Sequence, residues 1–203
     1  MTDYLQPYRE GLLEHGPSFE ATLWASPRTQ RRRFEAFAEA IPLAGKRLLD
    51  AGCGGGDLAA FLLERDIPYS HYLGLDAMPE MVEYARLRRL PRAEFRAADL
   101  LHDPHTMADA GAQIVLISGT LNTMSPQQAM TLLGHAWEAA GEALIFNFLS
   151  DRAGPLAASQ TGPARRHDTL GLMSWALSHS PRVAFRQDYL EHGHDATITI
   201  RRP

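Results

Sequence analysis

The residues best suited to bind a ligand form a short glycine-rich segment. Four of the five residues from 52 to 56 are glycine, and they follow Asp50 at the end of a short apolar run. Glycine adopts positive φ readily and lets a ligand approach the backbone closely. Ligands of open α/β sheets bind outside the carboxyl ends of the strands. The segment is therefore predicted to be a cofactor-binding loop rather than only a tight structural turn.

Two classes of ligand compete for this loop. Dinucleotide-binding folds use the pattern G-x-G-x-x-G/A. Counted from Gly52, the sixth position of the pattern is Asp57, where the pattern requires glycine or alanine. Counted from Gly54, the pattern fits through Gly56 and Ala59, but its first glycine then lies late after the strand. An acid at the start of the following helix would repel phosphates. Asp57 therefore favours a ligand without phosphate.

The elements that must position this loop alternate between strands and helices. The residues before Trp24 have only weak periodicity, and residues 150–166 are predicted to form a loop. Apolar periodicity and cap signals predict helices near residues 27–41, 58–63, 79–87, 126–140 and 168–178. Strands are predicted at residues 47–51, 72–76, 94–97, 112–118, 143–148, 183–189 and 196–200.

This pattern predicts an α/β fold: a doubly wound, mostly parallel seven-stranded sheet with helices on both faces. Only a few residues join the last two strands. Parallel neighbours need a crossover of a dozen or more residues, so these two strands must be antiparallel. We expect a single domain over residues 1–203 that ends in an antiparallel C-terminal hairpin strand.

The run Asp50-Ala51-Gly52-Cys53-Gly54-Gly55-Gly56 matches an acid-x-Gly-x-Gly-x-Gly motif in full. In this run the chain resembles the class I (Rossmann-like) S-adenosylmethionine-dependent methyltransferases. The resemblance implies that Gly52, Cys53 and Gly54 contact the methionine portion of the cofactor. It also implies that Asp50 helps to place the cofactor's amino group.

Later strand ends extend the resemblance over about residues 45–150. Asp76 would bind both ribose hydroxyls, since a carboxylate accepts two hydrogen bonds. Ala77 and Met78 would flank the adenine. Asp99 would accept a hydrogen bond from the adenine amino group, and Leu100 would add a backbone contact. The terminal hairpin also fits this family.

The resemblance also implies that the residues after the fourth strand face the transferred methyl group. Ser118 and Gly119 are expected to touch the cofactor. Asn122 could orient a substrate or could cap the loop. The segment departs from the Asn/Asp-Pro-Pro-Tyr/Phe motif of amino-methylating branches, and base methylation through a cysteine is disfavoured because Cys53 lies in the cofactor loop.

No catalytic residue can be assigned from the sequence. His135, His167 and His179 are candidate general bases, although each is more simply explained as a surface histidine. The pairs His102/His105 and His192/His194 could suggest a metal, but neither has clear supporting ligands. No metal site is predicted.

The segment before the core is expected to cover the site. Residues 1–44 are interpreted as an N-terminal helical lid or extension, and residues 45–203 as the Rossmann-like core. Tyr4, Tyr8, Trp24 and Arg33 lie in this segment, and Trp24 and Arg33 are candidate substrate contacts. The run Arg31-Arg32-Arg33 is otherwise interpreted as a solvated helix face.

The predicted function is methyl transfer from S-adenosylmethionine to a small molecule by direct in-line attack, with S-adenosylhomocysteine as product. The alternatives are a non-catalytic S-adenosylmethionine-binding module and an RNA or protein methyltransferase; an NAD-dependent dehydrogenase is disfavoured. A net charge of −4 argues against a strongly nucleic-acid-binding surface, although nucleic acid is not excluded. The sequence shows no signal peptide and no membrane-spanning run, so we expect a cytoplasmic protein without a membrane partner.

Overall fold

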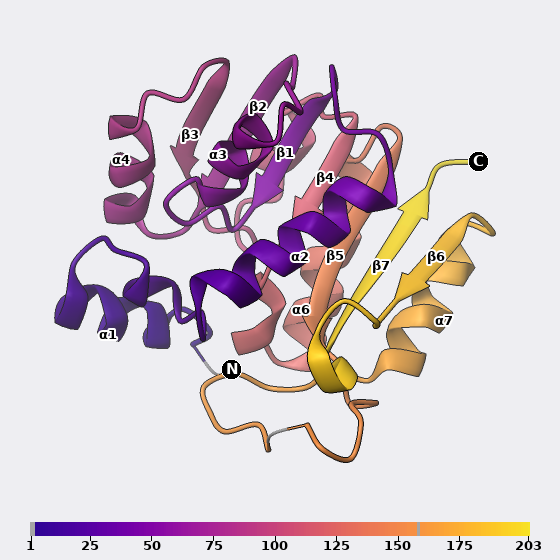
Figure 1. Cartoon of the computed structure of the whole chain (residues 1–203). Helices are drawn as coiled ribbons and strands as arrows, with labels where there is room; N and C mark the ends of the chain where they lie inside the picture. Colours follow the sequence, from indigo (N-terminus) through magenta and orange to yellow (C-terminus); the bar gives the residue numbers. More distant parts are fainter. Residues whose placement is uncertain (1–2, 158) are drawn as a thin grey trace.

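The computed structural model describes residues 3–157 and 159–203, built around one seven-stranded sheet (Figure 1). The strand order is β3-β2-β1-β4-β5-β7-β6. The neighbours from β3 to β5 pair in parallel, and β7 pairs antiparallel with both β5 and β6. The predicted fold class is confirmed. The strands are β1 (Arg47–Ala51), β2 (His71–Asp76), β3 (Ala93–Ala97), β4 (Ile114–Ile117), β5 (Ala143–Leu149), β6 (Val183–Arg186) and β7 (Asp195–Arg201).

Helices cover both faces of this sheet. Three of them begin directly after a residue whose side chain caps the first turn. Ser26, Ser125 and Asp168 each accept hydrogen bonds from the first turn of the helix that follows. The α-helices are α1 (Gln6–His15), α2 (Pro27–Ala40), α3 (Asp57–Glu64), α4 (Pro79–Leu87), α5 (His105–Ala108), α6 (Pro126–Ala139) and α7 (Thr169–His179). Short 3-10 turns are η1 (Glu20–Thr22), η2 (Thr120–Thr123) and η3 (Glu191–Gly193).

Strand β4 is apolar at every position, and β1 and β5 are apolar apart from Arg47, Asp50 and Asn147, because both faces of these strands are covered. In β1, Leu48 packs with α2 and α3, whereas Leu49 packs into the core on the side of α6 and α7. The same alternation in β4 and β5 divides the interior into two apolar layers. The sheet is therefore a rigid support for the loops at its carboxyl edge.

The structure adds elements that the apolar pattern did not predict. Helix α1 lies within the weakly periodic N-terminal segment, and Gly11 is its only buried residue. A Cβ on Gly11 would lie 3.3 Å from the Ala21 backbone. Because α1 packs closely through a glycine, its sequence has no apolar stripe at helical spacing. Strand β6 also ends at Arg186, earlier than predicted.

The carboxyl ends of β1, β2 and β4 share one edge of the sheet. Figure 1 shows α1, the start of α2 and the connection between β5 and α7 gathered at this edge. The glycine loop between β1 and α3 opens there, so the fold brings the N-terminal segment to the predicted cofactor loop.

Candidate active site

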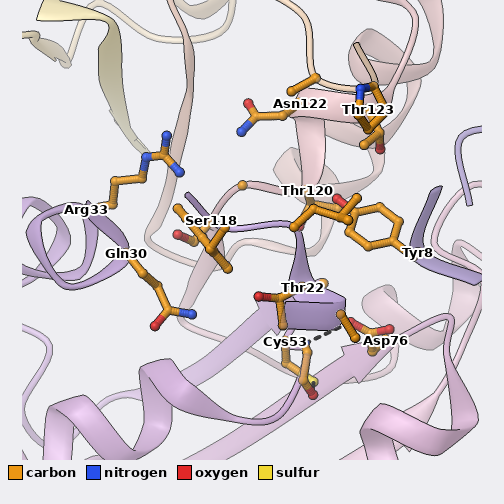
Figure 2. A pocket seen from close by; sticks show the side chains of 18 of the residues that line it. Tyr8, Thr22, Gln30, Arg33, Cys53, Asp76, Ser118, Thr120, Asn122 and Thr123 are labelled. Carbon is orange, nitrogen blue, oxygen red and sulfur yellow. Dashed lines mark hydrogen bonds between the residues drawn. The ribbon is translucent and has the colours of Figure 1, made fainter. Parts of the chain in front are cut away.

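A cavity of about 370 Å³ lies at this edge of the sheet (Figure 2). Its walls come from the glycine loop, the ends of β2 and β4, the N-terminal segment and residues 160–164. Its volume is within the usual range for a small-molecule site. All the predicted site residues except Asp99 line it: Trp24, Arg33, Asp50, Gly52, Cys53, Gly54, Asp76, Ala77, Met78, Leu100, Ser118, Gly119 and Asn122.

The glycine loop is held by contacts that leave no room for a side chain at Gly52. This residue has φ +89°, and a Cβ on it would lie 2.0 Å from Thr120 Oγ1. The Thr120 hydroxyl donates to the Ala51 carbonyl at 2.9 Å, and the Gly52 amide donates to the Leu75 carbonyl at 2.8 Å. Thr120, the first residue of η2, thus fixes the loop, a role that the sequence did not suggest.

Asp76 joins the end of β2 to the glycine loop. Its carboxylate accepts from the Gly54 amide at 2.8 Å and from the Met78 amide at 2.9 Å. Burial raises the pKa of Asp76, and these backbone hydrogen bonds oppose that rise. Each carboxylate oxygen has a second lone pair. Asp76 can therefore hold the loop and still accept from hydroxyl groups in the cavity.

Asp50 lines the cavity and has one carboxylate oxygen without a partner in the part of the chain that the structure describes. The side chain is buried, and its Oδ2 accepts from the Tyr72 hydroxyl. Its Oδ1 has no hydrogen-bond partner among the described residues. Burial raises the pKa of Asp50 to about 7, although the Tyr72 hydrogen bond opposes the shift. A buried carboxylate oxygen without a donor suits an ammonium group.

The raised pKa of Asp50 predicts a pH dependence of stability in the ligand-free protein. The folded protein holds this proton up to about pH 7, whereas the unfolded chain releases it near the ordinary pKa of 3.8. The Asp50 contribution to the free energy of unfolding therefore falls as the pH rises between these values. Urea unfolding across this range should give a flatter pH profile for Asp50→Asn than for the wild type. Identical profiles would contradict the assignment.

Asp99 does not line the cavity, although the next residue, Leu100, does. Its carboxylate accepts from the Tyr4 hydroxyl at 3.0 Å and from the Leu101 amide at 3.1 Å. The His102 ring also lies 3.0 Å from it. Tyr4 itself lines the cavity. In this arrangement the N-terminal segment stands between Asp99 and the cavity, and adenine recognition by Asp99 stays a prediction.

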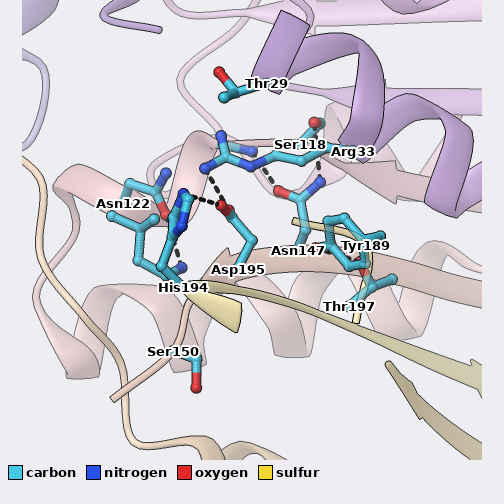
Figure 3. Close-up of polar contacts among 12 residues, drawn as sticks. Thr29, Arg33, Ser118, Asn122, Asn147, Ser150, Tyr189, His194, Asp195 and Thr197 are labelled. Carbon is cyan, nitrogen blue, oxygen red and sulfur yellow. Dashed lines mark hydrogen bonds and ion pairs between the residues drawn. The ribbon is translucent and has the colours of Figure 1, made fainter. Parts of the chain in front are cut away.

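A second cluster of charged side chains lies at the other end of the cavity (Figure 3). Arg33 of α2 pairs with Asp195, the first residue of β7, and stacks over the Trp24 ring at 4.3 Å. Asp195 is fully buried, and His194 Nε2 lies 2.9 Å from its carboxylate. Arg33 is only 5% exposed, so the interpretation of this residue as part of a solvated face is wrong.

Asn122 and Ser118 have local partners as well as positions in the cavity wall. Asn122 Oδ1 accepts from the Leu149 amide at 3.3 Å, which supports its interpretation as a loop cap. Ser118 Oγ accepts from the Asn147 amide group at 3.2 Å. The Asn122 amide nitrogen and the Ser118 hydroxyl proton keep their capacity to donate hydrogen bonds.

The three candidate histidine bases lie outside the cavity wall. His167 is buried against the Leu121 carbonyl at 2.8 Å, and His135 and His179 contact the carbonyls of Leu100 and Trp175. The histidine in the wall is His194, which the sequence analysis considered only as half of a metal pair. Its position depends on the antiparallel packing of β7, so no local signal could identify it.

Among the described residues, no group of three or more His, Cys, Asp or Glu side chains gathers as a metal site. Of the two pairs considered, His102 contacts Asp99 and His194 contacts Asp195. His102 and His194 thus each have a carboxylate partner that explains the position of the ring.

Asp57 is less repulsive to phosphate than its position suggests. It begins α3, but its carboxylate pairs with Arg88 at 2.7 Å and accepts from the Gln30 side chain at 3.1 Å. These partners offset much of its charge. The antiparallel β7 is the stronger argument against a dinucleotide fold, whose usual sheet order is 3-2-1-4-5-6.

Comparison with known proteins gives methyltransferases and one other kind of relative, the 3-methyl-2-oxobutanoate hydroxymethyltransferase of Burkholderia vietnamiensis, which is 30% identical over 124 residues, 56% of this chain and 45% of that protein. A family model described as a methyltransferase domain matches residues 48–140. The ubiquinone biosynthesis O-methyltransferase of Xylella fastidiosa is 31% identical over 90 residues, 41% of this chain and 35% of that protein. The trans-aconitate 2-methyltransferase of Methylobacterium radiotolerans is 45% identical over 60 residues, 29% of this chain and 22% of that protein. The chain thus spans about a third or less of these two curated methyltransferases.

The fold is shared with solved methyltransferase structures. The crystal structure of magnesium protoporphyrin IX methyltransferase from Synechocystis PCC 6803 with bound SAM has a TM-score of 0.69 and 15% sequence identity. The alignment covers 100% of this chain and 99% of that one. In the part of the chain that the structure describes, no helix is long and apolar enough to cross a membrane. Residues 48–140 thus match a methyltransferase domain, and the chain as a whole has the fold of solved methyltransferases.

Proposed function

We propose that the protein transfers a methyl group from S-adenosylmethionine to a small molecule by direct in-line attack. The observation that supports this most strongly is the continuity of the cavity. It runs from Asp76 past the glycine loop to Asn122 and His194. One ligand at the glycine loop and a second beyond Ser118 would share this space.

The polar groups of the cavity suit the parts of this cofactor. The backbone of Gly52 and Gly54 would hold the methionine portion, and Asp50 Oδ1 would accept from its ammonium group. Asp76 would accept from the ribose hydroxyls. When bound, S-adenosylmethionine supplies a sulfonium whose methyl group is already activated. The protein's own task is then to align the acceptor and to exclude water.

The cavity favours catalysis over simple cofactor binding. A non-catalytic module would be expected to have its acceptor side blocked. Here the cavity extends past Ser118 and Asn122 to Leu149. An acceptor therefore has access to the end of the cavity where the methyl group would lie.

The covering segments favour a small acceptor over RNA or protein. Tyr4, Tyr8 and Trp24 line the cavity from the N-terminal side, and residues 160–164 line it from the β5–α7 connection. A polymer would have to displace one of these segments to reach the glycine loop. The two curated methyltransferases described above are named for reactions of small molecules, which agrees with this choice.

Within this proposal, residues 1–44 act as a lid over the cofactor. Deleting residues 1–24 is expected to lower S-adenosylhomocysteine affinity by about tenfold or more, because three aromatic side chains of the cavity wall and the Tyr4–Asp99 hydrogen bond are lost. Tyr8→Ala should weaken binding in the same direction, whereas Leu13→Ser, at a side chain that is 88% exposed, should not. Calorimetry measures each affinity. Unchanged affinity and turnover after the deletion would overturn the lid.

Calorimetric titration of the full chain with S-adenosylmethionine and S-adenosylhomocysteine tests the proposed function. We expect both to bind at one site, and NAD not to compete. Asp76→Asn should weaken binding by about tenfold or more, because its new amide group would oppose the Gly54 or Met78 amide. Asp109→Asn, at an exposed acid, is the matched control. Binding of neither compound would refute the proposal.

A further inference from the structure

The end of the cavity beyond Ser118 gathers hydrogen-bond donors around one buried carboxylate. We define this acceptor end by Arg33, Asn122 and His194, together with Asp195 behind them (Figure 3). It lies away from the part of the cavity where Asp76 and Tyr8 are found (Figure 2). Its chemistry differs from that of the glycine-loop end, which presents the carboxylates of Asp50 and Asp76.

Arg33 has donors that the protein does not use. Its Nη2 pairs with Asp195, and its buried Nε has no hydrogen-bond partner among residues 3–157 and 159–203. The side chain is only 7% exposed, is stacked on Trp24, and lines the cavity. A guanidinium presents five N–H groups in a fixed fork that matches a carboxylate. A buried cation with unused donors beside a cavity indicates a binding site for an anion.

Asn122 adds a donor beside this guanidinium. By contrast, both ring nitrogens of His194 already contact protein groups, the Asp195 carboxylate and the Glu191 carbonyl. Asp195 fixes the His194 ring at 2.9 Å and raises the pKa of that histidine. The Leu149 amide occupies Asn122 Oδ1, so the Asn122 amide nitrogen is left to donate. Figure 3 shows Asn122 beside His194, with Arg33 on the other side of Asp195. These side chains come from different elements, which makes the cluster a product of the fold.

The charge of the cluster selects the kind of anion. Arg33 carries one positive charge, Asp195 one negative charge, and a protonated His194 would add one positive charge. The net charge is therefore at most +1, which balances one carboxylate better than a doubly charged phosphate. We propose that the acceptor end binds a carboxylate of the methyl acceptor, which is therefore a small carboxylic acid. This inference rests on the proposed methyltransferase function.

The test measures acid binding to protein saturated with S-adenosylhomocysteine. The probes are benzoate, phenylacetate and hexanoate, each compared with its carboxamide by calorimetry. A charge-assisted hydrogen bond contributes more than a neutral one, so we expect at least one acid to bind about tenfold or more tightly than its amide. Equal binding of acids and amides, or binding of none of the acids, would overturn the inference.

Two conservative variants separate recognition from folding. Asn122→Asp keeps the acceptor for the Leu149 amide but places a negative charge in the cluster, so acid binding should be lost. Arg33→Lys keeps the charge beside Asp195 but removes the fork, so acid binding should weaken by about tenfold. Both variants should unfold cooperatively. Unchanged acid binding in both of them would overturn the inference.

The methionine portion of the cofactor also carries a carboxylate. A second set of titrations distinguishes this carboxylate from that of the acceptor. Each variant is titrated with S-adenosylhomocysteine and with its decarboxylated analogue. If the acceptor supplies the carboxylate, Arg33→Lys changes both affinities alike. A loss confined to S-adenosylhomocysteine would assign Arg33 to the cofactor and overturn the acceptor assignment. Failure of S-adenosylhomocysteine to bind the wild type would refute the proposed function itself, a different result from failure of the acids alone.

Discussion

Gly52→Ala is expected to abolish measurable cofactor binding and to lower the free energy of unfolding by about 2–5 kcal/mol. The new Cβ would lie 2.0 Å from Thr120 Oγ1, at a residue whose φ of +89° disfavours any side chain. Relief would require Thr120 to move and give up its hydrogen bond to the Ala51 carbonyl. The glycine loop would then lose its contact with η2. Calorimetry and urea unfolding measure the two effects.

Gly45→Ala is the matched control for this substitution. Gly45 also has positive φ, at +73°, but a Cβ there would meet nothing within 4 Å. Gly45→Ala is expected to lower the free energy of unfolding only by the backbone strain, about 1–2 kcal/mol. Cofactor affinity should not change. If Gly52→Ala behaved like Gly45→Ala in both measurements, the close packing of the loop against Thr120 would have no role in binding.

Asp195→Asn should produce the second large effect, a loss of about 3–5 kcal/mol in the free energy of unfolding. Asp195 is fully buried and is the counter-charge of both Arg33 and His194. Removing its charge leaves the buried Arg33 guanidinium without a counter-charge. This lowers the free energy of unfolding far more than the loss of an exposed ion pair does. Thermal or urea unfolding of the variant measures the difference.

The exposed pair Arg31–Glu64 provides the comparison. Its atoms lie 2.9 Å apart, but both side chains are about half exposed. Glu64→Gln is expected to change stability by less than about 1 kcal/mol, because water screens the pair. A similarly small effect of Asp195→Asn on stability would show that the Asp195 charge does not stabilise Arg33 and His194 at the acceptor end.

The sequence predicts the parts of the site that depend on local pattern. The glycine loop after a buried strand, the acid at the end of β2 and the three capped helices all follow from neighbouring residues. The antiparallel last pair follows from the length of its connection. Each of these features is determined within about thirty residues, roughly the length of one strand-helix-strand unit.

Other parts of the site depend on contacts between distant segments. Thr120 fixes the glycine loop from η2, and His194 reaches the cavity only because β7 inserts beside β5. Arg88 directly follows α4 yet offsets the charge of Asp57 in α3. In the sequence these residues resemble ordinary surface residues. Their roles come from the packed fold, so no local pattern could reveal them.

The most direct test of the account is a crystal structure of the full chain with S-adenosylhomocysteine bound. We expect the ribose hydroxyls within hydrogen-bond distance of Asp76 and the ammonium group beside Asp50 Oδ1. The sulfur should point past Ser118 toward Arg33, Asn122 and His194. A ligand bound elsewhere, or one whose sulfur points away from this end of the cavity, would contradict the account.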